Sequence, residues 1–443
     1  MISGAALLIA ESPSPTTGED HVGHHGSGHR CHKTETIRAM SLIAATLGKI
    51  AAPERRTMAV ACGAHVLHDG YTDLLYVLLP LWQAQFELGY AEVGLLRALY
   101  VGAMAGFQIP AGAIAQRFGG ALVLGLGTAL AGIGYLIAGA SVGFAMLVGA
   151  LVIGGIGSGV QHPIGAHLVS QAFSGARSRQ ALAGYNFSGD LGKMAFPAAT
   201  AWLLTLMNWR AATTVIGIVG LGAAIAILAM RGLPGREGGS EQTAKGPEAT
   251  AGAAPSGRGF PLLLSIAMID SATRMGFLTF LPFLLQTKGA DLPMIGIALT
   301  LVFTGGACGK LACGWLGTRL GVVHATWLTE GLTALGILAL LPLPLFAGLA
   351  VLPLIGMALN GTSSVLYGTV PELVAPERRQ RAFSIFYTGG VGAGALSPIL
   401  YGMVSDALSV PIMMALVAAI VLTTLPLTWA LRPALRNLPA QAG

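Results

Sequence analysis

Charged residues are scarce in this sequence. Only 10% of the 443 residues are Asp, Glu, Lys or Arg, whereas 54% are hydrophobic, and an ordinary soluble domain is about 25% charged. A soluble protein of this composition would have too little polar surface to cover itself. Apolar stretches such as 211–230 and 408–431 have the length of a helix that spans a bilayer. The sequence therefore predicts an all-α integral membrane protein surrounded by lipid.

Cysteine is also scarce, and the motifs of common enzymes are missing. The chain has four cysteines, which show neither CxxC pairs nor the spacing of an extracellular disulfide framework. No P-loop or catalytic triad is visible, and the glycine-rich stretches lie inside apolar runs rather than between a strand and a helix. We therefore expect no disulfide, no metal, no cofactor, no nucleic-acid partner and no enzymatic activity.

The first 52 residues differ from the rest because they are polar and rich in Gly, Ser, Pro and His. Such a segment has too few apolar side chains to fold alone, so we predict a disordered cytoplasmic tail over 1–52. Its stretch HVGHHGSGHRCH (21–32) is rich in histidine, and tracts of this kind can bind metal. We favour the simpler interpretation of a leader that transport does not need.

Hydropathy and helix-breaking residues predict twelve membrane spans. They are 58–83, 91–115, 121–139, 143–169, 180–205, 210–231, 260–286, 293–316, 322–342, 345–370, 381–405 and 408–431. A hydrophilic linker rich in Gly, Pro and Ser, 232–259, divides six spans from six. The sequence therefore predicts an N-terminal half (53–231), a C-terminal half (260–432) and a short C-terminal tail (433–443).

Basic residues are distributed unevenly between the two sides of these spans. If the N-terminus is cytoplasmic, nearly all loop arginines and lysines fall on the cytoplasmic side, and the other side keeps only Arg210 and Lys288. By the positive-inside rule, both termini and the linker are cytoplasmic. We expect a multi-pass protein of the cell inner (plasma) membrane, acting as a monomer.

The two predicted halves repeat each other. The stretch VGLLRALYVGAMAGFQIPAGAIAQRFGG at 93 matches IGIALTLVFTGGACGKLACGWLGTRLGV at 295, at a constant offset of 202 residues. The aligned pairs include Gly94 with Gly296, Gly112 with Gly314, Arg117 with Arg319, Gly119 with Gly321 and Pro80 with Pro282. In transporters, repeats of this kind frame a substrate site near the bilayer midplane, and the halves move about it.

The paired Gly-x-x-x-x-Arg-x-Gly segments resemble the cytoplasmic signature of the major facilitator superfamily. The signature normally has an acid before the arginine, where this chain has Gln116 and Thr318. The resemblance covers about 58–432 and implies the major facilitator fold and transport of a small molecule by alternating access. It also implies a role in conformational switching for Gly112, Arg117, Gly314 and Arg319.

Three shorter motifs in the first half resemble the fosmidomycin-resistance type of drug exporter within that superfamily. They are His65-x-x-His68-Asp69 followed by Pro80, GIGSGVQHP at 155–163 and YNFSGDLGKMAFP at 185–197. Where that family tends to have an acid after the His-Pro pair, this chain has Ile164, and Lys193 adds a positive charge. The resemblance implies export of a small drug-like compound.

The first span carries a polar stripe. At 100° per residue, six side chains fall within a stripe about 140° wide: His65, His68, Asp69, Thr72, Asp73 and Tyr76. An aspartate facing lipid would cost roughly 2.5–3.5 kcal/mol at the bilayer centre. The stripe must therefore face the interior of the bundle or a watery cavity.

Other spans supply partners for this stripe. The candidate substrate-binding residues are His65, Tyr76, Arg97, Asn186, Asp190, Lys193, Asp270, Arg274 and Lys310. Four embedded aspartates thus face four embedded cations, as a low-dielectric interior requires. The pairs Asp190–Lys193 and Asp270–Arg274 could instead be intrahelical ion pairs that only hold the fold.

Asp69 and Asp73 are the strongest candidates for proton coupling because they exceed the cations of their own helix. A carboxyl group in an apolar cavity can pick up and release a proton, and His68 and His162 could relay it. We predict a secondary active transporter, coupled to protons, that exports a small drug-like or anionic compound. The alternatives are a proton symporter that imports an organic anion, suggested by the embedded arginines and lysines, and a membrane sensor or scaffold without transport activity.

Overall fold

The computed structural model of the chain describes residues 52–230, 259–375 and 378–436. Within these ranges the chain forms α-helices and no β-strand, which confirms the all-α prediction. The helices are α2 (Ala52–Phe86), α3 (Tyr90–Phe118), α4 (Gly120–Gly139), α5 (Phe144–Ser158), α6 (Gln161–Ala172), α7 (Gly175–Leu206), α8 (Trp209–Ala229), α9 (Gly259–Thr287), α10 (Leu292–Leu340), α11 (Leu345–Leu373), α12 (Arg379–Ala407), α13 (Val410–Leu422) and α14 (Thr424–Arg436). Almost all of the predicted tail 1–52 and linker 232–259 lies outside the described residues.

These helices combine into twelve membrane spans, as predicted. α5 and α6 together form the span Phe144–Ala172, α13 and α14 form Val410–Leu435, and α10 contributes two spans on either side of a kink at Gly321. Ten spans of the described chain are long and apolar enough to cross a bilayer by composition. The other two spans are α2 and α7, which are 35 and 32 residues long. Charged residues lower their hydropathy: α2 carries two embedded aspartates, and α7 carries an aspartate and a lysine.

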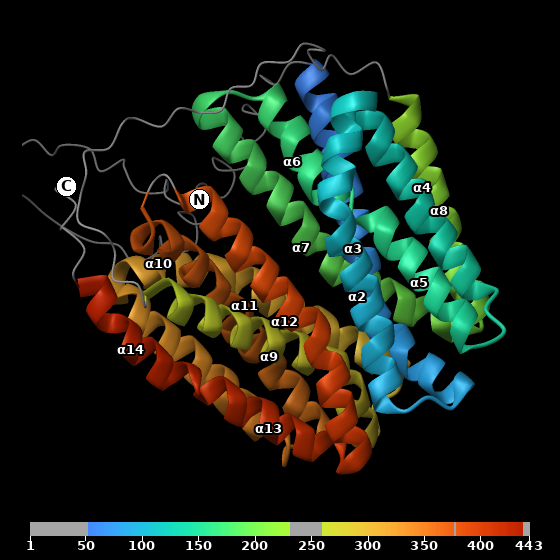
Figure 1. The fold of residues 1–443 in the computed structure, drawn as a ribbon. Helices are drawn as coiled ribbons and strands as arrows, with labels where there is room; N and C mark the ends of the chain where they lie inside the picture. Colours follow the sequence, from blue (N-terminus) through green and yellow to red (C-terminus); the bar gives the residue numbers. More distant parts are fainter. Residues whose placement is uncertain (1–51, 231–258, 376–377, 437–443) are drawn as a thin grey trace, which may run out of the picture.

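The twelve spans form two bundles of six. Figure 1 shows α2–α8 (blue to green) as one bundle and α9–α14 (yellow to red) as the other. Equivalent turns of the two bundles share an unusual backbone, since Gly119 has φ 89° and Gly321 has φ 74°. Glycine adopts such angles at little cost, whereas a residue with a side chain would be strained. The sequence repeat is therefore also a repeat of backbone geometry.

The apolar core that joins the two bundles lies toward one end of the molecule. At the end where α3 and α10 begin, which we call the far end, one core contains side chains of both bundles. At the end where α2 and α9 begin, each bundle has apolar cores of its own. Equivalent glycines permit the close contact at the far end: Gly94 of α3 lies against the Pro398 carbonyl of α12, and Gly296 of α10 lies against Ala201 of α7.

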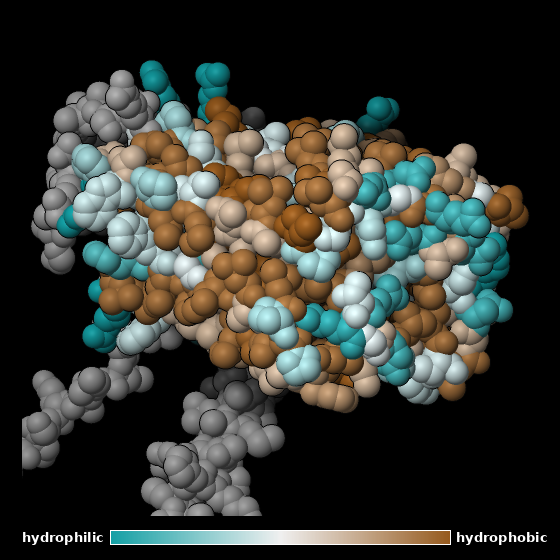
Figure 2. Space-filling model, turned by 90° about the horizontal axis from the view of Figure 1, so that it is seen from below, coloured by the Kyte–Doolittle hydropathy of each residue, from teal (hydrophilic) through white to brown (hydrophobic). Residues whose placement is uncertain are grey.

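The outer surface fits a lipid environment. Figure 2 shows one face of the molecule, where apolar residues form a broad brown area. Large apolar side chains remain exposed on several helices, with 61–67% of each residue accessible: Trp202, Ile225, Leu335, Leu354 and Leu400. Apolar exposure on this scale is typical of a surface that contacts a membrane or a partner, and for a bundle of twelve spans we assign it to lipid.

At the far end, a carboxylate of one bundle caps a helix of the other. Asp406 of α12 accepts hydrogen bonds from the backbone N–H groups of Tyr90 (2.6 Å) and Ala91 (2.9 Å) at the start of α3. The first N–H groups of a helix have no partner within it and carry partial positive charge, so a carboxylate there is stabilising. At the start of α10, the equivalent helix of the other bundle, the capping carboxylate is Asp291. It directly precedes α10 and accepts a hydrogen bond from the N–H of Met294, so it caps its own helix.

We predict that Asp406→Ala weakens the closed far end. Loss of a helix-capping side chain costs about 0.5–2 kcal/mol, and here that cost falls on one conformation, because the carboxylate and its partners belong to different bundles. Distances between spin labels placed at Val142 and Phe346, measured by electron paramagnetic resonance, should extend to longer values. Asp291→Ala is the control, since it removes a cap within one bundle. Unchanged distances in Asp406→Ala would contradict this role.

Candidate functional site

The polar stripe of α2 lies inside the protein. His65, His68, Asp69, Asp73 and Tyr76 each have only 0–6% of their surface accessible. They recur at intervals of three and four residues, so they share one face of the helix. The neighbours of α2 include α3, α4, α6, α7 and α9. The stripe therefore faces the interior, as the cost of exposing aspartate to lipid requires.

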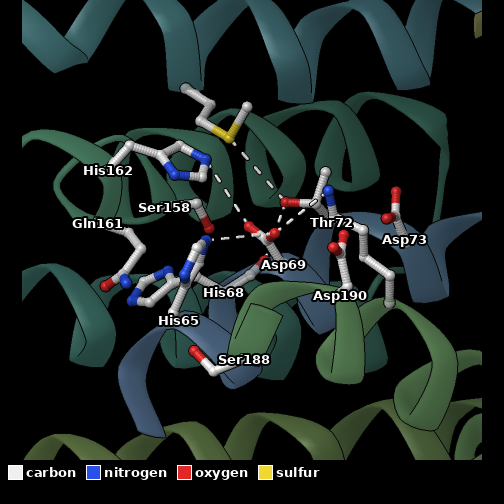
Figure 3. Close-up of polar contacts among 12 residues, drawn as sticks. His65, His68, Asp69, Thr72, Asp73, Ser158, Gln161, His162, Ser188 and Asp190 are labelled. Atoms are coloured by element: carbon white, nitrogen blue, oxygen red, sulfur yellow. Dashed lines mark hydrogen bonds and ion pairs between the residues drawn. The ribbon is translucent and has the colours of Figure 1, made fainter. Parts of the chain in front are cut away.

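Three basic side chains from three helices surround Asp69, and Figure 3 shows His65 and His162 directed toward it. Lys193 Nζ of α7 lies 3.3 Å from Asp69 Oδ2, and His65 Nε2 of α2 lies 3.4 Å from the same oxygen. His162 Nε2 of α6 lies 3.7 Å from Oδ1. Gly189 makes room for the cluster, because a Cβ at that position would lie 2.6 Å from both Asp69 Oδ2 and His65 Nε2.

The second ring nitrogen of His65 determines how this histidine can take up a proton. His65 Nδ1 lies 2.8 Å from the carbonyl oxygen of Tyr185, and a carbonyl oxygen only accepts hydrogen bonds. Nδ1 therefore carries a hydrogen, which leaves Nε2, the nitrogen beside Asp69, with a lone pair when the ring is neutral. The lone pair of a neutral His65 ring therefore faces the Asp69 carboxylate, 3.4 Å away.

The two histidines proposed as proton relays have different surroundings. His162 adjoins Asp69 and keeps 40% of its side chain accessible. His68 forms a 2.9 Å hydrogen bond with Thr128 Oγ1 of α4, and Thr128 donates its own hydrogen to a carbonyl oxygen of its helix. His68 is therefore the donor and links α2 to α4. Of the histidines on α2, it is His65, assigned to substrate from the sequence, that lies beside Asp69.

Arg97 of α3 neutralises Asp73 deep in the same bundle. The guanidinium group lies 3.5 Å from Asp73 Oδ1 and donates to Tyr76 Oη (2.8 Å) and to the carbonyl oxygen of Thr72 (2.7 Å). Its central carbon lies 4.4 Å from the centre of the Tyr76 ring. Tyr76 Oη in turn lies 3.6 Å from Met275 Sδ of α9. These contacts fix Arg97 in place and bring the pair to the border between the bundles.

A small polar hollow, partly open to solvent, lies between the two bundles. It is lined by Asp190 and Lys193 of α7, Phe303, Gly306, Ala307 and Lys310 of α10, and Asn360 of α11. Lys310 Nζ lies 2.5 Å from Asp190 Oδ1 and joins the bundles at this point. The intrahelical Asp190–Lys193 pair considered from the sequence is thus replaced by two pairs between helices, Asp190 with Lys310 and Lys193 with Asp69.

The remaining candidate residues are spread over both bundles. Arg274 NH1 lies 3.9 Å from Asp270 Oδ2 on α9, so this intrahelical pair does form. Asn186 is exposed on α7. Sequence reasoning missed Glu330 of α10, which is only 1% accessible. An acid within the apolar stretch 322–342 was the signal that could have revealed it.

The residues assigned to conformational switching lie at the end away from the far-end contact. Arg117 and Arg319 are exposed, and each guanidinium carbon lies over an aromatic ring of its own bundle, at 5.3 and 5.5 Å from the ring centre. Gly112 and Gly314 lie within α3 and α10. Their role in switching stays a prediction.

One group of donor atoms has the spacing of a metal site. The nitrogen and oxygen atoms that His65, Asp69 and His162 would offer lie within 4.8 Å of one another. The ammonium group of Lys193, however, already lies against the Asp69 carboxylate, and its positive charge would repel a metal cation. The ammonium group thus makes this cluster less suited to a metal cation than its spacing alone suggests.

A family model described as Major Facilitator Superfamily matches residues 61–265 and 262–442 of the chain. An uncharacterised MFS-type transporter of Mycobacterium tuberculosis is 28% identical over 145 residues, which is 32% of this chain and 25% of that protein. A probable L-galactonate transporter of Escherichia coli is 27% identical over 141 residues, 31% of each chain. The chain thus spans less than a third of either relative.

Solved transporter structures share the fold at low sequence identity. A bacterial homologue of the human lysosomal transporter Spinster, in an inward-facing and unoccupied conformation, superimposes with a TM-score of 0.75 at 16% identity, over 88% of this chain and 100% of that one. A mutant of the nucleoside transporter NupG gives a TM-score of 0.68 at 13% identity, over 86% and 99%. At these identities the likeness concerns the fold alone.

We predict that Arg97→Met destabilises the protein strongly. Removal of one partner of a buried ion pair costs about 3–5 kcal/mol, because the other charge is left unpaired. The double variant Arg97→Met with Asp73→Asn should recover part of the loss, since no unpaired charge remains. Thermal unfolding of the purified protein measures both effects, with Arg117→Met, an exposed arginine of the same helix, as the control. Equal unfolding temperatures in Arg97→Met and the control would refute the pairing.

Proposed function

The chain belongs to the major facilitator superfamily, and from this premise we propose that it is a secondary active transporter, driven by protons, for a small drug-like or anionic compound. Repeated helical halves in transporters move about a central substrate site, so that the site opens to each side of the membrane in turn. The fold supports the transporter class. The buried cluster around Asp69 supports the coupling to protons.

The observation that carries the proposal is that one side chain adjoins both the proton site and the hollow. Lys193 Nζ lies 3.3 Å from Asp69 Oδ2, and Lys193 also lines the hollow between the bundles. When a proton binds the His65–Asp69 pair, the attraction of the carboxylate for Lys193 weakens. The charge of Lys193 then becomes available to an anion in the hollow.

This arrangement couples the two ligands in both directions. An anion in the hollow attracts Lys193 away from Asp69, and a carboxylate that has lost its cation binds a proton more tightly. Binding free energies are linked reciprocally, so each ligand strengthens the binding of the other by the same factor. Asp73, held by Arg97 one helical turn from Asp69, is the second carboxyl that we assign to coupling.

The lining of the hollow favours a small compound with a negative charge. Two lysines, Lys193 and Lys310, and the amide of Asn360 can bind an anionic group, and the Phe303 ring offers an apolar surface. The hollow is narrow and partly open to solvent, so it suits a small anionic group better than a bulky ligand. Lys310 and Asp190 come from different bundles, so a ligand that separates this pair also acts on the contact between the bundles.

Two transport directions follow from different observations. The three motifs that resemble fosmidomycin-resistance exporters support export, which is our first candidate. Joint binding of a proton and an anion through Lys193 favours the second candidate, symport of an organic anion into the cell. The relative named a probable L-galactonate transporter makes that compound a suitable member of a test panel.

We predict that cells producing the protein differ from cells lacking it in their response to small anionic compounds. Export should raise the tolerated concentration of an inhibitory anion, whereas import should lower it or permit growth on a nutrient anion such as L-galactonate. An uncoupler should abolish either effect, because the proton gradient supplies the energy. A response that persists after uncoupling would point to a sensor or scaffold and would overturn the proposal.

We predict that Asp69→Asn abolishes accumulation driven by a proton gradient and leaves exchange of substrate across the membrane. Asparagine keeps the shape of the side chain but cannot take up a proton. Uptake into proteoliposomes with and without a pH gradient measures accumulation, and counterflow of labelled substrate measures exchange. Asp291→Asn, which changes a carboxyl that caps a helix, should keep both activities. Accumulation at the parent rate in Asp69→Asn would place the coupling site elsewhere.

A further inference from the structure

A second buried carboxyl cluster lies in the C-terminal bundle. Asp270 of α9 is 3% accessible and Glu330 of α10 is 1% accessible. The two carboxyl groups are close neighbours. Arg274 NH1 lies 3.9 Å from Asp270 Oδ2. This cluster belongs to the C-terminal bundle, whereas Asp69 belongs to the N-terminal bundle, and the coupling mechanism proposed above does not use it.

The internal repeat explains why these two positions meet. At the repeat offset of 202 residues, Asp270 is equivalent to His68 and Glu330 is equivalent to Thr128. In the N-terminal bundle His68 and Thr128 form a 2.9 Å hydrogen bond between α2 and α4. The fold therefore brings this pair of positions into contact in both bundles, and the C-terminal bundle places two carboxyl groups where the N-terminal bundle has a histidine and a threonine.

Two neighbouring carboxyl groups can form a hydrogen bond with each other only if one of them carries a proton. An ionised carboxylate only accepts hydrogen bonds, whereas a protonated carboxyl group also donates one. Glu330 Oε1 is buried and receives no hydrogen bond from a donor group of the described residues. If one of the two carboxyl groups is protonated, its O–H group can provide the hydrogen bond that Glu330 Oε1 otherwise lacks.

The balance of charge in the interior leads to the same result. Elsewhere in the described interior, each embedded carboxylate has a cation of its own: Asp69 with Lys193, Asp73 with Arg97, and Asp190 with Lys310. Within the described chain, Asp270 and Glu330 have Arg274 as their common cation, 3.9 Å from Asp270 Oδ2. The polar groups beside them on α10 and α11 are the neutral hydroxyls of Thr329 and Thr362. A second negative charge here would have no partner, which a low-dielectric interior does not tolerate.

We infer that Asp270 and Glu330 hold one exchangeable proton between them, as a proton-binding site of the C-terminal bundle. Arg274 balances the single negative charge that remains. The protein then has a proton site in each bundle, at His65–Asp69 and at Asp270–Glu330. The second site requires no substrate, so it can be tested separately from transport.

Infrared difference spectra of the purified full-length protein, recorded between low and high pH without substrate, test the inference. The C=O stretching band of a protonated carboxyl group should be present and should disappear reversibly as the pH rises. In Glu330→Gln this band should shrink by the contribution of one carboxyl group per protein, because the amide can still donate a hydrogen bond to Asp270 but has no proton to release. Asp190→Asn, which removes a carboxylate paired with Lys310, should keep that contribution.

A second variant shows whether a lost band reflects the missing carboxyl groups or a folding defect of Glu330→Gln. Asp270→His combined with Glu330→Thr installs the pair that this fold already packs at the equivalent positions of the N-terminal bundle, and it should lose the same contribution. Persistence of the full band in both variants, or its absence from the parent protein, would overturn the inference. Failure of the Asp69 coupling proposal would leave this spectrum unchanged, so the two outcomes can be told apart.

Discussion

A charge inside a membrane-embedded protein must be neutralised nearby, because moving an isolated ion out of water costs several kcal/mol even after the protein relaxes. This constraint governs the interior of the structure. It turns the polar face of α2 inward, and it places Lys193, Arg97 and Lys310 beside Asp69, Asp73 and Asp190. Asp270 and Glu330 share the single cation Arg274, and we infer that a proton neutralises the second carboxyl group.

The same constraint connects chemistry to conformation. The Asp190–Lys310 pair joins the two bundles, and Asp69 and Lys193 join α2 to α7 within one bundle. A proton or an anion that breaks one of these ion pairs leaves a charged side chain without its counterion. The packing of the bundles then determines which other charged group lies close enough to replace it. The far end is held by apolar packing and by Asp406 on the start of α3. Movement of the bundles about the hollow therefore changes both the solvation and the partners of the embedded charges.

Much of the fold could be predicted from the sequence, because span lengths, the polar linker and the 202-residue repeat are one-dimensional patterns. The inward face of α2 followed from helical periodicity and the cost of exposing aspartate to lipid. Partners on different helices could not be read this way, since periodicity gives the face of a side chain but not its neighbour. Asp190 therefore paired with Lys310 rather than Lys193, and His65 rather than His68 lies beside Asp69. Glu330 was missed because a single acid in an apolar span shows no periodic pattern.

A pH jump can detect the proton that we propose binds the His65–Asp69 pair inside the membrane. Proteoliposomes adsorbed on a solid-supported membrane give a transient current when protons enter a buried site, and no substrate is required. The account predicts a transient in the parent protein that is clearly reduced in Asp69→Asn and unchanged in Asp291→Asn. A transient of equal size in Asp69→Asn and the parent would show that the proton binds elsewhere and would contradict the account.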